Sequence, residues 1–188
     1  MMKESDFLLD YVNKGDRKER KVGRYWASEI YAIRKGYVTP NNFFDVKPVD
    51  VDGCRNIITG MAYENMLTNI LKDLKVPFMS QEKFIVRINP EIVIVVTPDF
   101  IFNSSVLETK HPVSLFKIND IFGNNPTIPY SYFDQLECEY RATNIDTYLG
   151  AFTTPFGLRC IKYIPTEKRW NGIKKLVIDF HDKLKERK

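Results

Sequence analysis

The sequence of 188 residues predicts an α/β fold in which helices flank a central mixed β-sheet. The spacing of apolar residues along the chain changes twice, which supports this fold class. Helical spacing gives way to strand spacing after residue 81, and helical spacing returns near residue 130. The third observation is the length, which suits one domain with a sizeable core. We therefore expect a single domain over residues 1–188, with an N-terminal helical segment at 1–53 and the core at 54–188.

The N-terminal part of the chain is expected to be mostly helical. Residues 5–35 are predicted to be helical, with Ser28 as the N-cap of a short helix that Gly36 ends. Residues 37–53 are rich in Pro, Asn and Gly and predict a loop. Residues 55–75 predict a strong helix with an apolar stripe. The residues of this stripe are Tyr63, Leu67, Ile70, Leu71 and Leu74.

The remaining chain is expected to alternate between strands and helices. The predicted strands cover residues 82–88, 91–102, 105–110, 147–154 and 158–164. Residues 113–129 contain several Gly, Asn and Pro residues and predict a loop. Residues 130–144 predict a helix, and the apolar stripe from Ile173 to Leu184 predicts a second one.

The composition excludes several classes of protein. Hydrophobic residues form 44% and charged residues 28% of the chain, which is ordinary for a globular protein in water. Apolar runs are far shorter than the roughly 20 residues that span a bilayer, and the N-terminus lacks the apolar stretch of a secretion signal. The cysteines Cys54, Cys138 and Cys160 are widely spaced, which argues against a disulfide framework, a zinc site or an iron–sulfur site. We therefore expect a cytoplasmic protein without a membrane anchor.

Basic residues gather in the N-terminal segment, and the formal net charge is +4. The cluster consists of Arg17, Lys18, Arg20, Lys21 and Arg24. Two interpretations stay open for it. The cluster is either the solvated face of a helix or a surface that contacts nucleic-acid phosphates independently of base sequence.

The stretch TPDFIFNSSVLETKHP at 97–112 places charges directly after the most apolar run of the chain, IVIVV. If Asn103 and Ser104 form a two-residue turn between strands, then Asp99 lies opposite Glu108. Opposed side chains of an antiparallel pair have Cβ atoms about 4.5–5.5 Å apart, so two carboxylates there repel each other. A divalent cation such as Mg²⁺ relieves this repulsion, because it prefers hard oxygen ligands.

Lys110 is expected on the same strand face as Glu108, because the two residues are two positions apart. Pro98 has no amide hydrogen, so strand pairing is expected to loosen beside Asp99 and to leave side chains there free to reach a ligand. The alternative interpretation of this segment is a surface hairpin with an ordinary salt bridge.

Two predicted helices carry further polar residues of interest. Glu64 lies near the apolar stripe of helix 55–75, and is either a boundary residue facing water or a third carboxylate aimed at the metal. Tyr132 and Gln135 lie about one turn apart on helix 130–144. The alternative interpretation of Gln135 is an exposed amide.

Together these elements resemble the PD-(D/E)XK nuclease superfamily, and within it the lambda-exonuclease and YqaJ-type viral recombinase branch, which is RecB-like. The order and approximate spacing of the branch's elements hold over residues 24–140. The matching elements are Arg24 with Ala27-Ser28-Glu29, Gly60 with Glu64, Pro98-Asp99, Glu108-Thr109-Lys110 with Pro112, and Tyr132 with Gln135. The resemblance implies a restriction-endonuclease-like core at 54–188.

The resemblance implies metal-dependent hydrolysis of phosphodiester bonds. Asp99 and Glu108 would hold one or two Mg²⁺ or Mn²⁺ ions, with Glu64 and the carbonyl of Thr109 as further ligands. The catalytic residues implied by the resemblance are Asp99, Glu108, Lys110 and Gln135. Lys110 would position or help deprotonate the attacking water, and Gln135 would orient Lys110 or that water.

The resemblance also implies contacts with DNA. Segment 1–53 would contact DNA, and Arg24 and Ser28 are candidates for holding a 5′-terminal phosphate. Lys110 and Tyr132 would contact DNA close to the metal. The other implied partners are a single-strand-annealing or other recombination protein, and further copies of the chain in a trimer or dimer.

The resemblance favours a Mg²⁺-dependent deoxyribonuclease, and specifically an exonuclease on duplex DNA ends in viral-type recombination, replication or repair. A viral protein of this kind would act in the host cytoplasm. Two alternatives stay open. One is a structure-selective or single-strand DNA endonuclease of the RecB-like group. The other is a non-catalytic nucleic-acid-binding member, which is supported by Phe100, His111 and Glu137 where the branch often has glycine, cysteine and a second glutamine.

Overall fold

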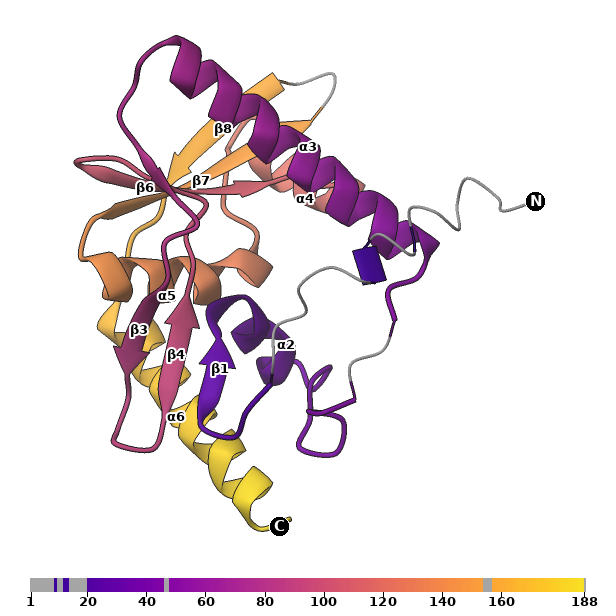
Figure 1. Cartoon of the computed structure of the whole chain (residues 1–188), viewed down its shortest axis with the longest axis vertical. Coiled ribbons are helices and arrows are strands. Elements are labelled where there is room, and N and C mark those ends of the chain that lie inside the picture. The colour runs from indigo at the N-terminus through magenta and orange to yellow at the C-terminus, as the bar shows by residue number, and fades with distance from the viewer. Residues whose placement is uncertain (1–8, 10–11, 14–19, 46–47, 154–156, 188) are drawn as a thin grey trace.

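The computed structural model describes residues 9, 12–13, 20–45, 48–153 and 157–187, and its elements are arranged as in Figure 1. Arg17 and Lys18 of the predicted basic cluster lie outside the described residues. The strands are β1 (Arg24–Trp26), β2 (Met79–Ser80), β3 (Phe84–Arg87), β4 (Val93–Val96), β5 (Phe100–Ile101), β6 (Ser105–Lys110), β7 (Asp146–Thr153) and β8 (Gly157–Lys162). The helices are η1 (Ala27–Glu29), α2 (Ile30–Arg34), α3 (Val51–Asp73), α4 (Leu115–Phe122), η2 (Tyr130–Tyr132), α5 (Phe133–Thr143) and α6 (Glu167–Lys185).

The strands form two mixed sheets, which confirms the predicted α/β class. The smaller sheet has the order β1-β4-β3, with β1 parallel and β3 antiparallel to β4. The larger sheet has the order β2-β5-β6-β7-β8, in which β6 and β7 are parallel and the other pairs antiparallel. In the described residues no helix is both long and apolar enough to cross a membrane.

The strand predicted over residues 91–102 is two strands that belong to different sheets. β4 ends at Val96 and β5 begins at Phe100, so the chain passes from the smaller to the larger sheet through Thr97, Pro98 and Asp99. Pro98 cannot donate a hydrogen bond to a neighbouring strand, which favours a break at this point. The single central sheet of the sequence prediction is therefore divided in two, and Asp99 lies at the division.

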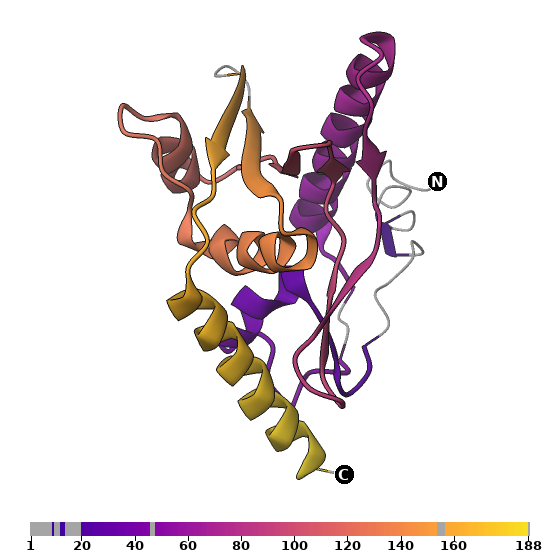
Figure 2. The same ribbon diagram turned by 90° about the vertical axis from the view of Figure 1, so that its left-hand side faces the viewer.

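Helix α5 crosses the middle of the molecule between the two sheets, as Figures 1 and 2 show. Its residue Leu136 belongs to the apolar core that covers the larger sheet. Cys138 belongs to the second apolar core, where α2 and α6 cover the smaller sheet. Gln135 and Glu139 are one turn apart on the face between these two contacts. Gln135 and Glu139 therefore form a polar stripe on α5 that faces the junction of the two sheets.

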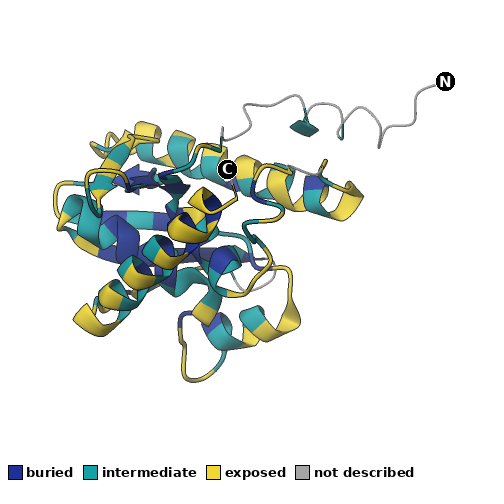
Figure 3. Ribbon diagram, turned by 90° about the horizontal axis from the view of Figure 1, so that it is seen from below, coloured by how far each residue is buried: buried dark blue, intermediate teal, exposed yellow. Residues whose placement is uncertain are grey.

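Helix α3 covers the other face of the larger sheet. Its anchor is Tyr63, whose ring stacks on that of Phe152 in β7 with centroids 4.7 Å apart. Asp50 caps the helix by accepting a hydrogen bond from the amide of Gly53. The predicted apolar stripe of this helix is buried only in part, because Leu74 is 68% exposed and Ile70 is also exposed. The exposed outer faces of the helices and the more buried strands are visible in Figure 3.

Three local predictions are wrong. Residues 113–129 are not all loop, because α4 occupies part of them and buries Ile121 before Gly123 ends the helix. The prediction of helix over 5–35 fails at β1, which pairs with β4 as a strand. Ser28 is not an N-cap, because it lies inside the turn η1 and Glu29 precedes α2.

Candidate active site

The hairpin of β5 and β6 has the register that the sequence predicted. Phe100 pairs with Leu107, and Ile101 pairs with Val106. The amide of Phe102 donates to the carbonyl of Ser105, which leaves residues 103–104 as the two-residue turn. Continued by one position, this register brings Asp99 beside Glu108 at the start of β5, where the chain enters the larger sheet.

Asp99 is fixed by its neighbour on β6. The amide and the hydroxyl of Thr109 both donate to Asp99 Oδ2, at 2.7 Å each. Burial raises the pKa of Asp99 to about 7, and the negative charge of Glu108 acts in the same direction. Within the described part of the chain, the other oxygen, Oδ1, accepts only a long 3.5 Å hydrogen bond from Gln81.

Glu108 lies at the centre of the site and is 2% exposed. One of its oxygens, Oε1, accepts hydrogen bonds from both Lys110 Nζ and Gln135 Nε2, the latter at 2.5 Å. Its other oxygen, Oε2, is buried and has no hydrogen-bond partner among the described residues. A buried carboxylate oxygen without a donor is costly, and its negative charge is suited to a cation.

Lys110 is a positive charge among the carboxylates of the site. Burial alone would lower the pKa of Lys110, but the carboxylates of Glu108, Asp99 and Glu139 raise it overall. Its ammonium group also lies 6.0 Å from the ring centre of Tyr132. Lys110 therefore stays protonated within a cluster of acids.

Two further elements bring carboxylates toward this centre. Glu64 of α3 is half-buried, and both burial and the charge of Glu108 raise its pKa. Glu139 of α5 is fully buried, and its pKa is raised well above the usual range by burial and by Glu108. Both side chains are therefore within electrostatic reach of Glu108.

Glu139 is the residue that the sequence reasoning missed as a member of the site. Both of its carboxylate oxygens are buried, and a hydrogen bond with the Glu108 side chain is one of the interactions that raise the pKa of Glu139. The signal was present in the sequence, because Glu139 follows Gln135 by four residues and so lies on the same helix face. A glutamate is rarely placed at a buried helix position unless it is paired or functional.

Gln135 and Tyr132 have more specific contacts than the sequence indicated. Gln135 is not an exposed amide, because it donates to Glu108 and holds that carboxylate beside Lys110. The hydroxyl of Tyr132 accepts a hydrogen bond from Lys117 Nζ at 3.3 Å. Tyr132 thus lies between two lysines at the rim of the site.

Arg24 and Ser28 come from the smaller sheet and are less closely joined to the acidic centre. Arg24 is half-buried in β1, with its guanidinium 5.6 Å from the ring centre of Trp26. The ammonium group of Lys83 lies at the same distance from that ring. Trp26 pairs with Val95 of β4, the strand that precedes Asp99 in the chain. Ser28 is exposed on η1.

The donor set fits a hard divalent cation in part. Among the described residues, no three side chains of His, Cys, Asp or Glu already form a cage that could hold an ion. Lys110 and Gln135 occupy Glu108 Oε1, while Glu108 Oε2 has no partner and Asp99 Oδ1 has only a weak one. Two carboxylates with available oxygens match the one or two carboxylates through which Mg²⁺ is usually bound.

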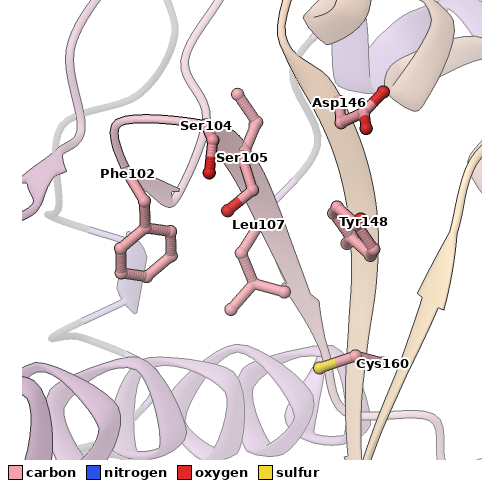
Figure 4. A pocket seen from close by; sticks show the side chains of 8 residues that line it. Phe102, Ser104, Ser105, Leu107, Asp146, Tyr148 and Cys160 are labelled. Carbon is pink, nitrogen blue, oxygen red and sulfur yellow. The ribbon is translucent and has the colours of Figure 1, made fainter.

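A separate cavity of about 460 Å³ is lined by side chains of the β5–β6 hairpin, β7 and β8, as Figure 4 shows. Leu107 lines it, and side chains alternate along a strand, so the cavity is on the face opposite to Glu108. Its carboxylate, Asp146, forms an ion pair with Lys162. The cavity is therefore not part of the acidic site.

Comparison with known proteins finds similarity in structure. No protein-family model and no curated protein matches the sequence. An alkaline exonuclease from Laribacter hongkongensis, LHK-Exo, superposes with a TM-score of 0.64 over 88% of this chain and 90% of its own, at 12% identity. The protein SSO0001 superposes with a TM-score of 0.67 over 95% of this chain and 85% of its own, at 16% identity. LHK-Exo in complex with dAMP gives a TM-score of 0.66, at 12% identity. The chain thus shares the overall fold of these solved structures.

Proposed function

We propose that the chain is a metal-dependent deoxyribonuclease that hydrolyses phosphodiester bonds, and specifically an exonuclease acting on duplex DNA ends. The observation that carries the proposal is the buried carboxylate of Glu108, which has Asp99, Lys110 and Gln135 around it and one oxygen without a donor. This arrangement occurs in a fold shared with an alkaline exonuclease.

Asp99 and Glu108 are the proposed ligands of one or two Mg²⁺ or Mn²⁺ ions. Glu64 and the carbonyl of Thr109 are proposed as further ligands. A bound divalent ion supplies Lewis-acid polarisation of the phosphate and lowers the pKa of a coordinated water. Thr109 keeps Asp99 in place through its amide and hydroxyl, and Gln135 keeps Glu108 in place.

Lys110 is the proposed residue that stabilises negative charge on the scissile phosphate and orients the attacking water. Its surroundings keep it protonated, so it acts as a fixed positive charge in a site with little solvent. Lys117 and Tyr132 extend this positive surface at the rim. Arg24 and Ser28 are proposed to contact the end of the DNA strand, and segment 1–53 is proposed as the DNA-contact segment.

The preference for an exonuclease is supported by the nature of the structural neighbour. LHK-Exo is an alkaline exonuclease, and it has been seen in complex with dAMP. A nucleoside monophosphate has the chemical form of the unit that an exonuclease releases. A role in recombination or repair, with an annealing partner and an oligomeric assembly, belongs to the same proposal.

A cleavage assay tests the activity. Linear duplex DNA and closed circular DNA are incubated with the folded protein and Mg²⁺, with EDTA as the control. We expect shortening of the linear duplex and release of mononucleotides, with the closed circle intact. Cleavage of the closed circle would replace the exonuclease proposal with an endonuclease. Failure to cleave either substrate would contradict the proposed activity.

A non-catalytic DNA-binding protein is the second candidate function. The observation in its favour is that Lys110 and Gln135 already satisfy Glu108 Oε1, and that no complete cation cage exists among the described residues. Calorimetric titration with Mn²⁺ separates the two candidates. Binding that is lost in Asp99→Ala supports the enzyme, whereas DNA binding without Mn²⁺ binding supports the second candidate.

A further inference from the structure

Three tyrosines and two lysines outside the acidic centre are linked by contacts between rings and ammonium groups. Tyr31 and Lys35 belong to α2 and its C-cap, Lys117 belongs to α4, and Tyr130 and Tyr132 begin and end η2. We call these five residues the tyrosine–lysine track. They come from three separate parts of the chain, so the fold brings them together.

One end of the track lies against the acidic centre. The ring centre of Tyr132 is 6.0 Å from Lys110 Nζ, which donates to Glu108. The same ring centre is 4.7 Å from Lys117 Nζ, which also donates to the Tyr132 hydroxyl at 3.3 Å. Tyr132 therefore connects the charge of Lys117 to the lysine of the site.

The other end of the track is open to solvent. Tyr130 lies two residues before Tyr132 on η2, and its ring meets that of Tyr31 edge to face with centroids 6.1 Å apart. Lys35 Nζ is 5.9 Å from the centre of each of these two rings. Tyr130 is 49% exposed and Lys35 is also exposed, so aromatic surface and a positive charge are presented side by side.

The positive charges of the track are not neutralised by acids. Across the residues that the structure describes, neither Lys35 nor Lys117 forms an ion pair with a carboxylate. The carboxylate of Asp134, near Tyr130, is already paired with Arg34 and Arg169. The track is thus a positively charged surface in which ammonium groups and tyrosine rings alternate.

This alternation matches the chemistry of a single strand of nucleic acid. Such a strand carries phosphates for the lysines, and its unpaired bases offer flat faces for the tyrosine rings. A duplex keeps the faces of its bases stacked inside and offers phosphates alone. An acidic peptide would satisfy the lysines but would give the rings no flat partner.

We propose that the tyrosine–lysine track binds an unpaired DNA strand and leads it toward Glu108. Bases stack on Tyr130 and its neighbouring rings, and phosphates lie against Lys35 and Lys117. The inference rests on the proposed function for the destination of the strand, while binding to the track itself requires no metal. The substrate that fits both is a duplex end that carries a single-stranded extension.

The test measures fluorescence anisotropy of two labelled probes in EDTA, oligo-dT and a blunt hairpin duplex of equal length. The proteins are the natural chain, Tyr130→Leu and Tyr130→Phe. We expect Tyr130→Leu to weaken oligo-dT binding about tenfold, because an aliphatic side chain cannot stack on a base. The same variant should change hairpin binding by less than about twofold. Tyr130→Phe keeps the ring and should bind both probes like the natural chain.

The lysines are tested by the salt dependence of oligo-dT binding. Lys35→Ala and Lys117→Ala should each lower the slope of log K against log salt by about 0.7, the share of one phosphate contact on a single strand. Lys174→Ala is the matched control, because Lys174 Nζ lies 5.8 Å from the ring centre of Trp170. That ring also faces Arg141, near the opposite end of α5 from η2, so the slope should not change.

The outcomes separate the inference from the proposed function. Unchanged oligo-dT affinity in Tyr130→Leu, or equal weakening for both probes, would overturn the inference, because the ring would then contact no bases. Displacement of oligo-dT by polyglutamate at the same charge concentration would also overturn it, since the surface would then bind any polyanion. The expected pattern in a protein that cleaves no DNA would confirm the track and contradict only the proposed nuclease activity.

Discussion

Glu108 is a buried carboxylate whose two oxygens have different surroundings. It is buried, it carries two donors on one oxygen, and its second oxygen has none. Asp99 is held by hydrogen bonds from Thr109, so its position depends on the neighbouring residue of β6. Individual side chains are thus held by their neighbours, and such preorganisation would lower the cost of organising the transition state of the proposed reaction.

Glu108→Gln is expected to remove the proposed nuclease activity. The substitution keeps the shape of the side chain but removes the charge that would bind the proposed ion. A cleavage assay with linear duplex DNA and Mg²⁺ should show a loss of about 10³-fold or more. Glu91→Gln is the control, because Glu91 is exposed and pairs with Lys185 of α6, and it should cleave normally. Comparable activity in both variants would contradict the assignment of Glu108.

At the scale of elements, α5 links the site to the rest of the fold. Asp134, at its start, accepts hydrogen bonds from Arg34 of α2 at 2.7 and 3.1 Å and from Arg169 of α6 at 3.2 Å. These contacts hold the helix that carries Gln135 and Glu139. The orientation of two site residues therefore depends on two helices that do not themselves contact Glu108.

Asp134→Ala is expected to destabilise the fold and loosen the site. Asp134 is fully buried and both arginines are partly buried, so the loss is about 2–3 kcal/mol in the free energy of unfolding. Urea denaturation measures this value. Asp146→Ala is the control, since its exposed pair with Lys162 contributes less than about 1 kcal/mol. Equal losses in the two variants would show that α5 is not held by this network.

The sequence predicted elements well where their signal is local. β6 was predicted with its observed bounds, and the turn at residues 103–104 gave the hairpin register correctly. α4 was missed because the Gly, Asn and Pro residues that follow it dominate the segment. The predicted strand over residues 91–102 gives no sign that its two halves belong to different sheets, since Val95 pairs with Trp26, which is far away in the chain, whereas Phe100 pairs with Leu107 of the next strand.

The site itself was only partly predictable, because some of its residues are brought together by contacts between distant parts of the chain. Asp99, Glu108 and Lys110 lie on one hairpin, so strand geometry was enough to bring them together. Glu139 required knowledge of how α5 packs against both sheets, which depends on Leu136 and Cys138 entering different cores. A single sequence contains the helical spacing but does not contain that packing.

At the scale of the whole molecule, metal binding and folding stability should be coupled. The site takes residues from α3, from the link between the sheets, from β6 and from α5, so an ion that binds there favours the assembled structure. Mg²⁺ at about 100 times its dissociation constant should add about 2.7 kcal/mol. For a chain of this size the melting temperature should then rise by about 5–10 °C.

This coupling is measured by thermal melting with and without Mg²⁺, and EDTA should reverse the change. Asp99→Asn is the matched variant, because it keeps the hydrogen-bonding shape and loses the charge. Its melting temperature should not respond to Mg²⁺. A rise of the same size in Asp99→Asn would place the stabilising ion elsewhere on the surface.

The late position of α5 and α6 also matters while the protein is being made. Asp99, Glu108 and Lys110 leave the ribosome first, but Gln135 holds Glu108 only after α5 has formed. α5 is in turn fastened by Arg169 near the start of α6. A nascent chain that stops before α6 therefore lacks the contact that Arg169 makes with α5, so the site is completed only late in synthesis.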